Sequence, residues 1–257
     1  MNWNEEAYRQ LVIDILTEGK EVDNRNGTSR MVPGAQIKLD VSGYKLPLIT
    51  GRKMYPRGII GEAITLMQAG KGPIHISEFE QNGCNYWKLW SDKQGFLRID
   101  YPVREHFHRI INNIKKDPRS RRHIIDLWNE ENIPKLSLPC CHTQYQFIVE
   151  NNNIHMIWTQ RSADVMIGVP ADMVLATIYL RVIANETGYE AGTITMNFGD
   201  THIYTEHLEG AKEYTRREHT HEPYMYIRDI PYIELKPSDF VVKDYYPEDP
   251  INFLLKE

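Results

Sequence analysis

Apolar and polar residues follow two different periods along this chain, and the two periods distinguish helices from strands. Apolar positions three or four residues apart predict helices over residues 7–18, 59–67, 103–116 and 171–186, and a basic helix ending near residue 217. Alternation predicts strands over residues 31–39, 123–127, 143–150, 154–159 and 193–198, with further strand character after residue 240. Because helices and strands interleave without a linker or a repeat, we expect residues 1–257 to form a single α/β domain.

Glycine, proline and asparagine mark the breaks between these elements. Residues 23–28 indicate a turn, and residues 151–153 indicate the turn of a hairpin. Residues 70–102 are irregular and carry Trp87 and Trp90, so we expect a binding loop region there. A purely structural role in the hydrophobic core explains the presence of Trp90 equally well.

The charge balance and the cysteine content narrow the class of protein. The 257 residues carry 30 basic and 35 acidic side chains, a net charge of -5, with no long block of one sign. A nucleic-acid partner is therefore not expected, although local basic clusters could bind a small phosphate. Three cysteines, two of them adjacent, fit neither a disulfide framework nor a zinc site, so we expect no metal. Without a leader sequence or an apolar stretch of ~18 residues, a soluble cytoplasmic protein is expected.

The segment 138–172 carries the clearest candidate chemistry. Cys141 begins one predicted strand with His142 beside it, and Arg161 and Ser162 end the next. A cysteine attacks as its thiolate, whose pKa falls from ~8.5 when a cation lies close, and Arg161 could supply that cation. A Cys/His hydrolase is disfavoured, because neighbours in a strand point to opposite faces. The segment suggests a covalent site for a phosphorylated substrate.

Several charged residues permit both a structural and a functional explanation. Glu62 lies on the apolar stripe of its helix, where a satisfied structural glutamate and a tuned acid or base are equally consistent. Asp172 falls in the first turn of a helix that Pro170 begins, a position that favours any carboxylate. Arg25 and the basic run 119–122 could be solvated charges or phosphate ligands.

Three blocks of sequence carry a family resemblance that extends over most of the chain. Residues 139–147, 160–172 and 199–207 resemble the thymidylate synthase family, including its pyrimidine hydroxymethylase branch. The spacing between the blocks fits that family without insertions, and further matches include residues 25–27, 59–62, 117–122 and 246–247. The resemblance implies a thymidylate synthase-like α/β (α+β) domain, in which a mixed β-sheet packs with helices, and a homodimer formed through the sheet.

The same resemblance implies one-carbon transfer to C5 of a pyrimidine nucleoside monophosphate, with 5,10-methylenetetrahydrofolate as co-substrate. Cys141 matches the family's nucleophile and would add to C6, which makes C5 able to attack the folate methylene. Glu62 would organise water and proton transfers, Tyr101 would help remove the C5 proton, and His142 would join the polar network near the base.

Ligand-binding roles are implied for a further set of residues. The phosphate would be held by Arg25, Arg161 and Ser162, with Arg121 and Arg122 supplied by the neighbouring subunit of the homodimer. The sugar hydroxyls would be bound by His202 and Tyr204. The folate side of the cleft would include Arg52, Trp87, Asp164 and Gly168 together with the C-terminal tail.

Asp172 departs from the family pattern in a way that concerns the base. Synthases acting on uracil usually carry asparagine there, whose amide can donate to O4 and accept from N3–H. Cytosine presents an amino donor and an N3 acceptor, which suits a carboxylate that shares a proton with N3. This aspartate resembles that of the deoxycytidylate and cytidylate hydroxymethylases. A cytosine nucleotide, dCMP or CMP, is therefore the expected substrate, and Asp172 is expected to take part in catalysis.

Other departures concern the last step of the reaction. Ala171 replaces a bulky phenylalanine, Cys140 replaces a proline, and Arg52 replaces a folate-side lysine. A roomier cleft could admit the water that gives a hydroxymethyl product in place of a methyl product. Two alternatives stay open: a deoxyuridylate enzyme, either a thymidylate synthase or a dUMP hydroxymethylase, and a catalytically silent nucleotide- or RNA-binding relative.

Overall fold

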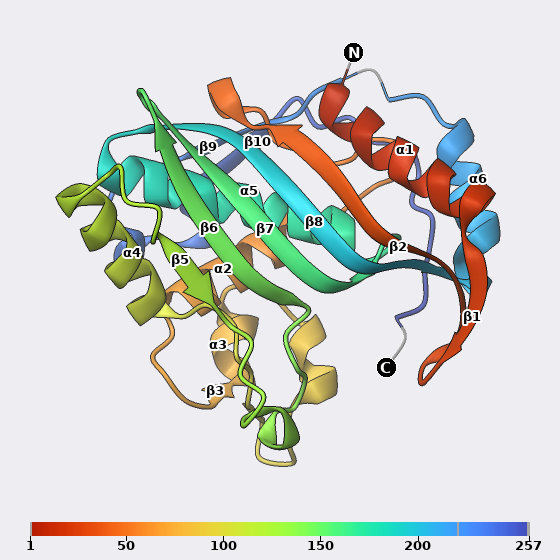
Figure 1. Cartoon of the computed structure of the whole chain (residues 1–257), viewed down its shortest axis with the longest axis horizontal. Helices are drawn as coiled ribbons and strands as arrows, with labels where there is room; N and C mark the ends of the chain where they lie inside the picture. Colours follow the sequence, from red (N-terminus) through yellow and green to blue (C-terminus); the bar gives the residue numbers. More distant parts are fainter. Residues whose placement is uncertain (1, 220, 256–257) are drawn as a thin grey trace.

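The computed structural model describes residues 2–219 and 221–255 and centres on a mixed sheet of six strands (Figure 1). The strand order is β1-β2-β8-β7-β6-β5, and all neighbours are antiparallel except β7 and β8, which are parallel. These strands are β1 (Lys20–Asn24), β2 (Gly27–Asp40), β5 (Ile124–Asp126), β6 (His142–Glu150), β7 (Asn153–Asp164) and β8 (Glu190–Tyr204). The expected mixed sheet packed with helices is confirmed.

Helices and two small ribbons make up the other elements of the described chain. The α-helices of the described residues are α1 (Trp3–Glu18), α2 (Pro56–Gln68), α3 (Ile76–Gln81), α4 (Arg104–Lys116), α5 (Gly168–Thr187) and α6 (Leu208–Arg216). Short 3-10 turns are η1 (Ser42–Tyr44), η2 (Tyr86–Trp90), η3 (Ile133–Lys135), η4 (Thr205–His207), η5 (Tyr232–Glu234) and η6 (Pro237–Asp239). Two ribbons pair β3 (Ile74–His75) with β4 (Phe96–Leu97) and β9 (Tyr224–Ile227) with β10 (Phe240–Lys243). None of the described helices has the length and apolar character needed to cross a membrane.

The predicted elements are present, and the main differences lie at their ends. Helix α1 begins at Trp3, earlier than predicted, because the Asn2 side chain caps it by accepting from the Glu5 N–H at 3.1 Å. The turn predicted over residues 23–28 is shorter, since β1 and β2 stay paired up to Asn24 and Gly27. Strand β8 extends well beyond the predicted residues 193–198, and β9 was not predicted.

An aromatic column runs through the core from α4 to the sheet. Phe107 of α4 packs edge-on against Tyr179 of α5, with ring centroids 5.0 Å apart. Tyr179 lies 6.4 Å from Trp158 of β7, which stacks on Tyr145 of β6 at 4.4 Å. All four side chains are fully buried, and Trp158 also lies 4.4 Å from the ring of His142. Because interiors are close-packed, this column restricts the position of His142 at the start of β6.

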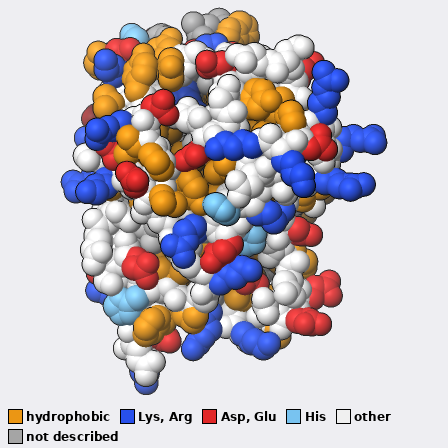
Figure 2. Space-filling model, turned by 90° about the vertical axis from the view of Figure 1, so that its left-hand side faces the viewer, with side chains coloured by type: hydrophobic (Ala, Val, Ile, Leu, Met, Phe, Trp, Pro, Cys, Tyr) orange, Lys and Arg blue, Asp and Glu red, His pale blue; other side chains and the backbone are white. Residues whose placement is uncertain are grey.

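The sheet has one covered and one open face. Helix α5 lies behind β7 and β8 in Figure 1, whereas β6 and β7 present their other face toward the viewer. Side chains alternate between buried and half-buried along β7, and Ile148 of β6 is 40% exposed. Figure 2 shows the left-hand side of the molecule, where Lys and Arg side chains are interspersed with Asp and Glu. No large region of one charge covers that side of the described chain.

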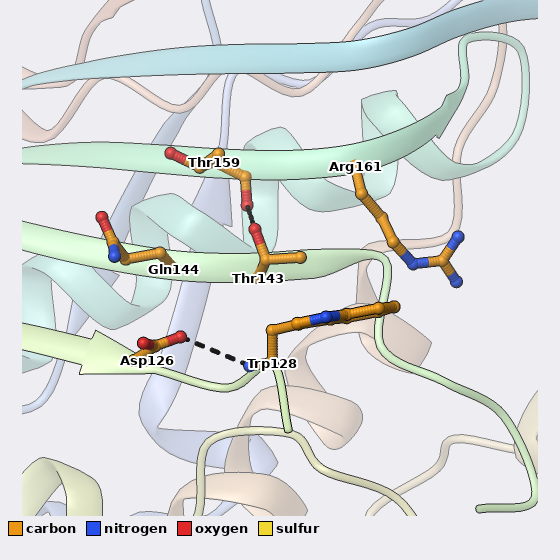
Figure 3. A pocket seen from close by; sticks show the side chains of 6 residues that line it. All are labelled: Asp126, Trp128, Thr143, Gln144, Thr159 and Arg161. Carbon is orange, nitrogen blue, oxygen red and sulfur yellow. Dashed lines mark hydrogen bonds between the residues drawn. The ribbon is translucent and has the colours of Figure 1, made fainter. Parts of the chain in front are cut away.

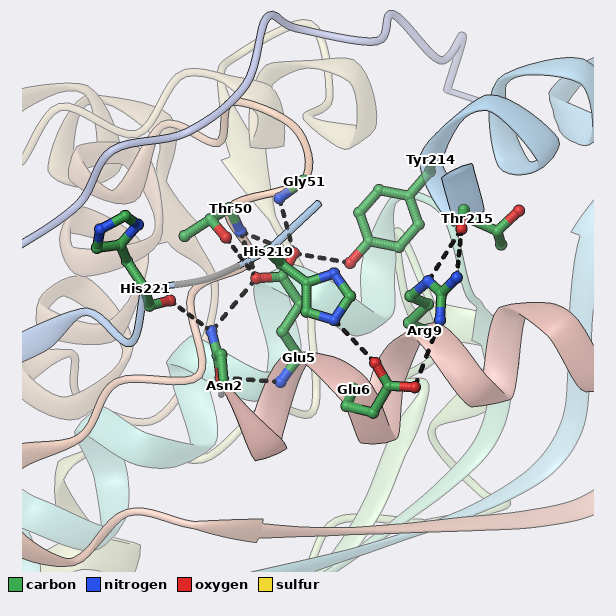
Figure 4. Close-up of polar contacts among 10 residues, drawn as sticks. All are labelled: Asn2, Glu5, Glu6, Arg9, Thr50, Gly51, Tyr214, Thr215, His219 and His221. Atoms are coloured by element: carbon green, nitrogen blue, oxygen red, sulfur yellow. Dashed lines mark hydrogen bonds and ion pairs between the residues drawn. The ribbon is translucent and has the colours of Figure 1, made fainter. Parts of the chain in front are cut away.

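A buried carboxylate in the first turn of α1 joins distant parts of the chain (Figure 4). Glu5 is 1% exposed and accepts hydrogen bonds from the backbone N–H groups of Thr50 and Gly51, the latter at 2.7 Å. The hydroxyls of Thr50 and Tyr214 donate to the same carboxylate at 2.7 and 2.9 Å. These bonds fix the loop that leads into Arg52.

Replacing this carboxylate should destabilise the fold strongly. Glu5→Ala leaves the buried donors of Thr50, Gly51 and Tyr214 without their acceptor, so we expect a loss of about 3 kcal/mol in the free energy of unfolding. Urea denaturation measures the loss. As a control, Glu18→Ala removes an exposed carboxylate from the last residue of the same helix, and the expected change is less than about 0.5 kcal/mol. Equal losses in the two variants would contradict the role of Glu5.

Candidate active site

The parallel pair β7 and β8 brings candidate residues from three elements to one end of the sheet. In its register, Ser162 lies opposite Asp200 and Asp164 lies opposite His202. The chain between the two strands forms α5, whose first turns carry Asp172. Ligands of α/β sheets usually bind at the carboxyl ends of parallel strands, so the fold itself indicates this end as the site.

Arg161 of β7 holds the segment that leads into the candidate nucleophile. Its backbone N–H donates to the carbonyl oxygen of Cys141 at 2.8 Å, and its guanidinium donates to the carbonyls of Cys140 and Pro139 at 2.9 and 3.1 Å. Its charge also lies 5.4 Å from the ring of Trp128. Figure 3 shows these two side chains beside a pocket of about 370 Å³, which is lined by Asp126, Trp128, Thr143, Gln144, Thr159 and Arg161.

Cys141 is the accessible thiol of the three cysteines, since Cys84 and Cys140 are buried and Cys141 is partly exposed. The cation of Arg161 lowers the pKa of Cys141, as expected, but the net shift of that pKa is upward. Burial disfavours the thiolate and raises the pKa of Cys141, and the cation of Arg161 only partly offsets that effect. Arg161 is near the thiol, as expected, but desolvation is the larger influence.

A buried polar network lies next to Cys141 and involves His142 and Asp172. One ring nitrogen of His142 lies 3.3 Å from Asp172 Oδ1, and the other lies 2.7 Å from the hydroxyl of Tyr145. The amide of Gln160 donates to Asp172 Oδ2 at 2.9 Å, and the indole of Trp158 donates to Gln160 Oε1 at 3.1 Å. Both nitrogens of His142 are therefore engaged away from the thiol, which argues further against a Cys/His pair.

Glu62 combines deep burial with two hydrogen-bond donors from one 3-10 turn. Its side chain is 7% exposed; Tyr86 donates to Oε2 at 2.5 Å, and the Trp87 indole donates to Oε1 at 2.8 Å. Burial raises the pKa of Glu62 to about 7, although both donors and His142 act in the opposite direction. Both explanations left open by the sequence fit: the carboxylate has a donor at each oxygen, and its raised pKa suits an acid or base near neutral pH.

Tyr101 contacts both Trp87, which binds Glu62, and the backbone of Cys141. It is 5% exposed and packs edge-on against Trp87 and His142, with ring centroids 5.3 and 4.8 Å apart. Its hydroxyl accepts from the Cys141 N–H at 3.5 Å. Burial raises the pKa of Tyr101 well above its ordinary value, and the negative charge of Asp172 adds to the effect, so its phenol keeps its proton at neutral pH.

The end of β8 adds a second group of polar side chains. His202 is buried, with Nδ1 2.7 Å from Asp200 Oδ1, while its Nε2 has no partner among the described residues. Such a buried, unpaired nitrogen is available to a ligand. Asp164 accepts from two backbone N–H groups that follow it in the chain, and burial raises its pKa against the effect of nearby histidines. Tyr204 is also buried.

Arg52 and the C-terminal tail meet beside this group. The guanidinium of Arg52 donates to the carbonyl of Met166 and lies 5.0 Å from the ring of Phe253. Gly168 is the first residue of α5, and a Cβ built there would lie 3.7 Å from Asp172 Oδ2. Of the residues assigned to the folate side, Gly168 is therefore close to Asp172, and Arg52 contacts the segment that leads into α5.

The arginines expected to bind phosphate occupy two different regions. Arg25 is exposed in the β1–β2 turn, at a cavity of about 630 Å³ that is also lined by Trp90 and by residues 133 and 136–139. Arg121 and Arg122 are exposed in the loop before β5, and neither makes an ion pair among the described residues. Among the described residues, no ion pair joins their side chains to the group around Cys141.

Sequence reasoning missed three residues of this site. The sequence predicts no role for Tyr86. Its position next to Trp87 is the one signal in the sequence that suggests a contact with Glu62. Gln160 and Tyr145 lie on neighbouring strands, and their bonds to Asp172 and His142 depend on the register, including an irregularity after His142. A sequence pattern of alternating residues does not define such a register.

A partly exposed thiol beside a buried polar network can serve as the nucleophile of a covalent intermediate. The thymidylate synthase family model matches residues 6–256, and the chain belongs to that family. Membership supports folate-dependent one-carbon transfer to a pyrimidine nucleotide, with methylenetetrahydrofolate as co-substrate. Among the described residues, no group of three or more His, Cys, Asp or Glu side chains is arranged to hold a metal ion.

Alkylation by iodoacetamide tests the state of the thiol. Cys141 should react before Cys84 and Cys140, and its rate should still rise when the pH passes the ordinary thiol pKa of ~8.5, because burial disfavours the thiolate. Arg161→Met should slow the reaction several-fold, since it removes the cation that favours the thiolate. Peptide mass mapping follows the modification. Arg216→Met, an exposed control on α6, should leave the rate unchanged; equal rates for all three proteins would contradict the role of Arg161.

Proposed function

We propose that the protein adds a hydroxymethyl group to C5 of a cytosine nucleotide, dCMP or CMP, with methylenetetrahydrofolate as one-carbon donor. The observation that carries the proposal is the carboxylate of Asp172, where relatives acting on uracil usually have asparagine. It is 8% exposed and lies in the network of His142 and Gln160, next to Cys141. Family membership supports the reaction class, and Asp172 favours cytosine within that class.

The preference for cytosine follows from the hydrogen-bonding groups of the two bases. A carboxylate accepts about four hydrogen bonds, so Asp172 can accept from Gln160 and His142 and still accept from the amino group of cytosine. A proton shared between Asp172 and N3 would draw electrons from the ring as the thiolate adds. Uracil would direct its O4 at the same carboxylate, and two acceptors facing each other repel.

The reaction would proceed through a bond between Cys141 and C6 of the base. The thiolate adds to C6, which makes C5 nucleophilic toward the folate methylene. The C5 proton leaves to a water held by the neutral hydroxyl of Tyr101, and tetrahydrofolate departs to leave an exocyclic methylene. Water then adds to that methylene, and the thiolate leaves C6. Glu62 suits the proton transfers, because a pKa of about 7 lets it hold or release a proton at neutral pH.

The choice of water as the last reactant is supported by the residue beside Asp172. Ala171 is half-buried there, where family members usually carry phenylalanine, so a ring's volume is absent next to the base network. A water molecule needs little room and two to four polar partners, which the carboxylates and hydroxyls of this site supply. Hydride transfer would give a methyl group and is the competing outcome.

The phosphate would be bound by arginines from two subunits of a homodimer. Arg25 and Arg161 belong to the chain that supplies Cys141, together with Ser162. Arg121 and Arg122 carry charges that are exposed and unpaired in the described chain, which suits a role in the site of a partner subunit. The open face of the sheet is the surface we expect the two subunits to share.

A substrate panel tests the choice of base. The enzyme is offered dCMP, CMP and dUMP separately with methylenetetrahydrofolate, and the product is weighed by mass spectrometry. We expect a hydroxymethyl product from a cytosine nucleotide, and Asp172→Asn should shift the ratio of kcat/KM values toward dUMP by tenfold or more, since about 1–3 kcal/mol separates matched from mismatched hydrogen bonds. Asp229→Asn, an exposed control, should leave the ratio unchanged.

The other outcomes of that panel have distinct meanings. Turnover of dUMP alone would reject the argument from Asp172, and a methyl product would reject water as the last reactant. Nucleotide binding without turnover of any base would support a silent relative. A cytosine preference that survives Asp172→Asn would show that another residue selects the base.

Mixing two inactive variants tests the shared arginines. Cys141→Ala should abolish turnover, and the double variant Arg121→Ala with Arg122→Ala should weaken nucleotide binding. In a mixed dimer one site has an intact Cys141 and receives both arginines from its partner, so activity should rise above that of either parent protein. Subunit exchange after mild denaturation, followed by a turnover assay, measures the gain. A mixture no more active than its parents would contradict sharing across the interface.

A further inference from the structure

The hydroxyl of Tyr86 makes the shortest hydrogen bond to the buried carboxylate of Glu62. The two residues that hold this carboxylate are consecutive in η2: the Tyr86 hydroxyl reaches Oε2 at 2.5 Å, and the Trp87 indole reaches Oε1 at 2.8 Å. Each oxygen of Glu62 therefore has its own donor. A carboxylate that accepts a hydrogen bond at each oxygen cannot rotate freely, so η2 defines the orientation of Glu62.

The packing of Tyr86 against α2 is specific. Gly58 lies four residues before Glu62, on the same face of α2, and a Cβ built at Gly58 would lie 3.4 Å from the Tyr86 ring. The small residue lets the ring lie along the helix and reach the carboxylate one turn later. Tyr86 is 39% exposed, whereas Glu62 and Trp87 are 7% and 4% exposed. Tyr86 thus links the buried carboxylate to the surface.

We propose that Tyr86 is a positioning residue, whose hydroxyl holds Glu62 in place and keeps its carboxylate in the charged form that accepts protons during turnover. This inference rests on the proposed function, in which Glu62 relays protons. The direction of the bond supports it, because a phenol that donates to a carboxylate stabilises the charged form. Burial and the charge of Glu62 raise the pKa of Tyr86 well above its ordinary value, so the phenol remains the donor.

The other groups around Glu62 do not replace the two hydrogen bonds from η2 that stabilise its charged form. Asp172 of α5 disfavours a second negative charge, and burial disfavours it more, while His142 of β6 favours it. Cys84 contacts Tyr86, and burial and the charge of Glu62 raise its pKa to about 12, so it stays a neutral thiol. Tyr86 and Trp87 are the two neutral hydrogen-bond donors that lower the pKa of Glu62, against the increase caused by burial.

Tyr86→Phe removes the hydroxyl and keeps the ring. The pKa of Glu62 should rise by roughly one pH unit, the size expected for a lost hydrogen bond to a charged group. The ascending limb of the pH profile of kcat/KM should move to higher pH by the same amount, because the charged form is then reached later. Activity should be reduced at neutral pH and should approach that of the unchanged enzyme at alkaline pH. Tyr55→Phe, an exposed tyrosine one residue before α2, is the matched control.

A second measurement separates this inference from the proposed function. Carbon-13 labelling of glutamate side chains lets NMR follow the titration of Glu62 in the free protein, with Glu62→Gln to assign its signal. If no substrate is turned over but Tyr86→Phe still raises the titration midpoint, the proposed function fails and the role of Tyr86 stands. An unchanged midpoint, or a loss of activity equal at every pH, would reject the role of Tyr86.

Discussion

The parallel pairing of β7 with β8 is the constraint on which the candidate site depends. Two parallel neighbours need a crossover, and α5 supplies it, so the start of this helix lies at the ends of both strands. Asp164 and the first turns of α5, which carry Asp172, lie at the same end of the sheet as His202 for that reason, although His202 is much later in the sequence. Helix α5 also packs against α2 and α4. Its position is therefore fixed by the core, and the chemistry at its first turns is carried on a rigid support.

Burial dominates the electrostatics of this site, and hydrogen bonds and cations only moderate it. The pKa values of Cys141, Glu62 and Tyr101 are all raised, and desolvation is the largest cause each time. A bound nucleotide would bring its own charge and displace water, so the balance at Cys141 depends on the ligand as well as on Arg161. Burial therefore limits the reactivity of the Cys141 thiol by disfavouring its thiolate.

The fold and much of the site could be predicted from the sequence because periodicity and motif spacing are local signals. The helices and the hairpin of β6 and β7 follow from such signals, and Cys141, Arg161 and Asp172 lie near one another as the motifs suggest. The features that the sequence does not predict depend on contacts between residues that are distant in the sequence. The pKa of Cys141 depends on burial, and the contact between Tyr86 and Glu62 joins a helix to an irregular segment. Strand β8 was predicted too short, because its polar end residues are ordered by pairing with β2 and β7 and not by their own pattern.

The hydrogen bonds of the Glu5 carboxylate affect the order in which parts of the fold can form while the chain is being synthesised. Its bond to Tyr214 spans 209 positions, and Arg217 in turn donates to the carbonyls of Gly51 and Asp249. The loop before Arg52 therefore receives its last hydrogen bonds only after Tyr214 and Arg217 have been synthesised. Contacts between such distant segments form late, because closing a long loop costs entropy first. Strands β6 and β7 and helix α5 precede Tyr214 in the chain, so they are synthesised before the loop that leads into Arg52 receives its last hydrogen bonds.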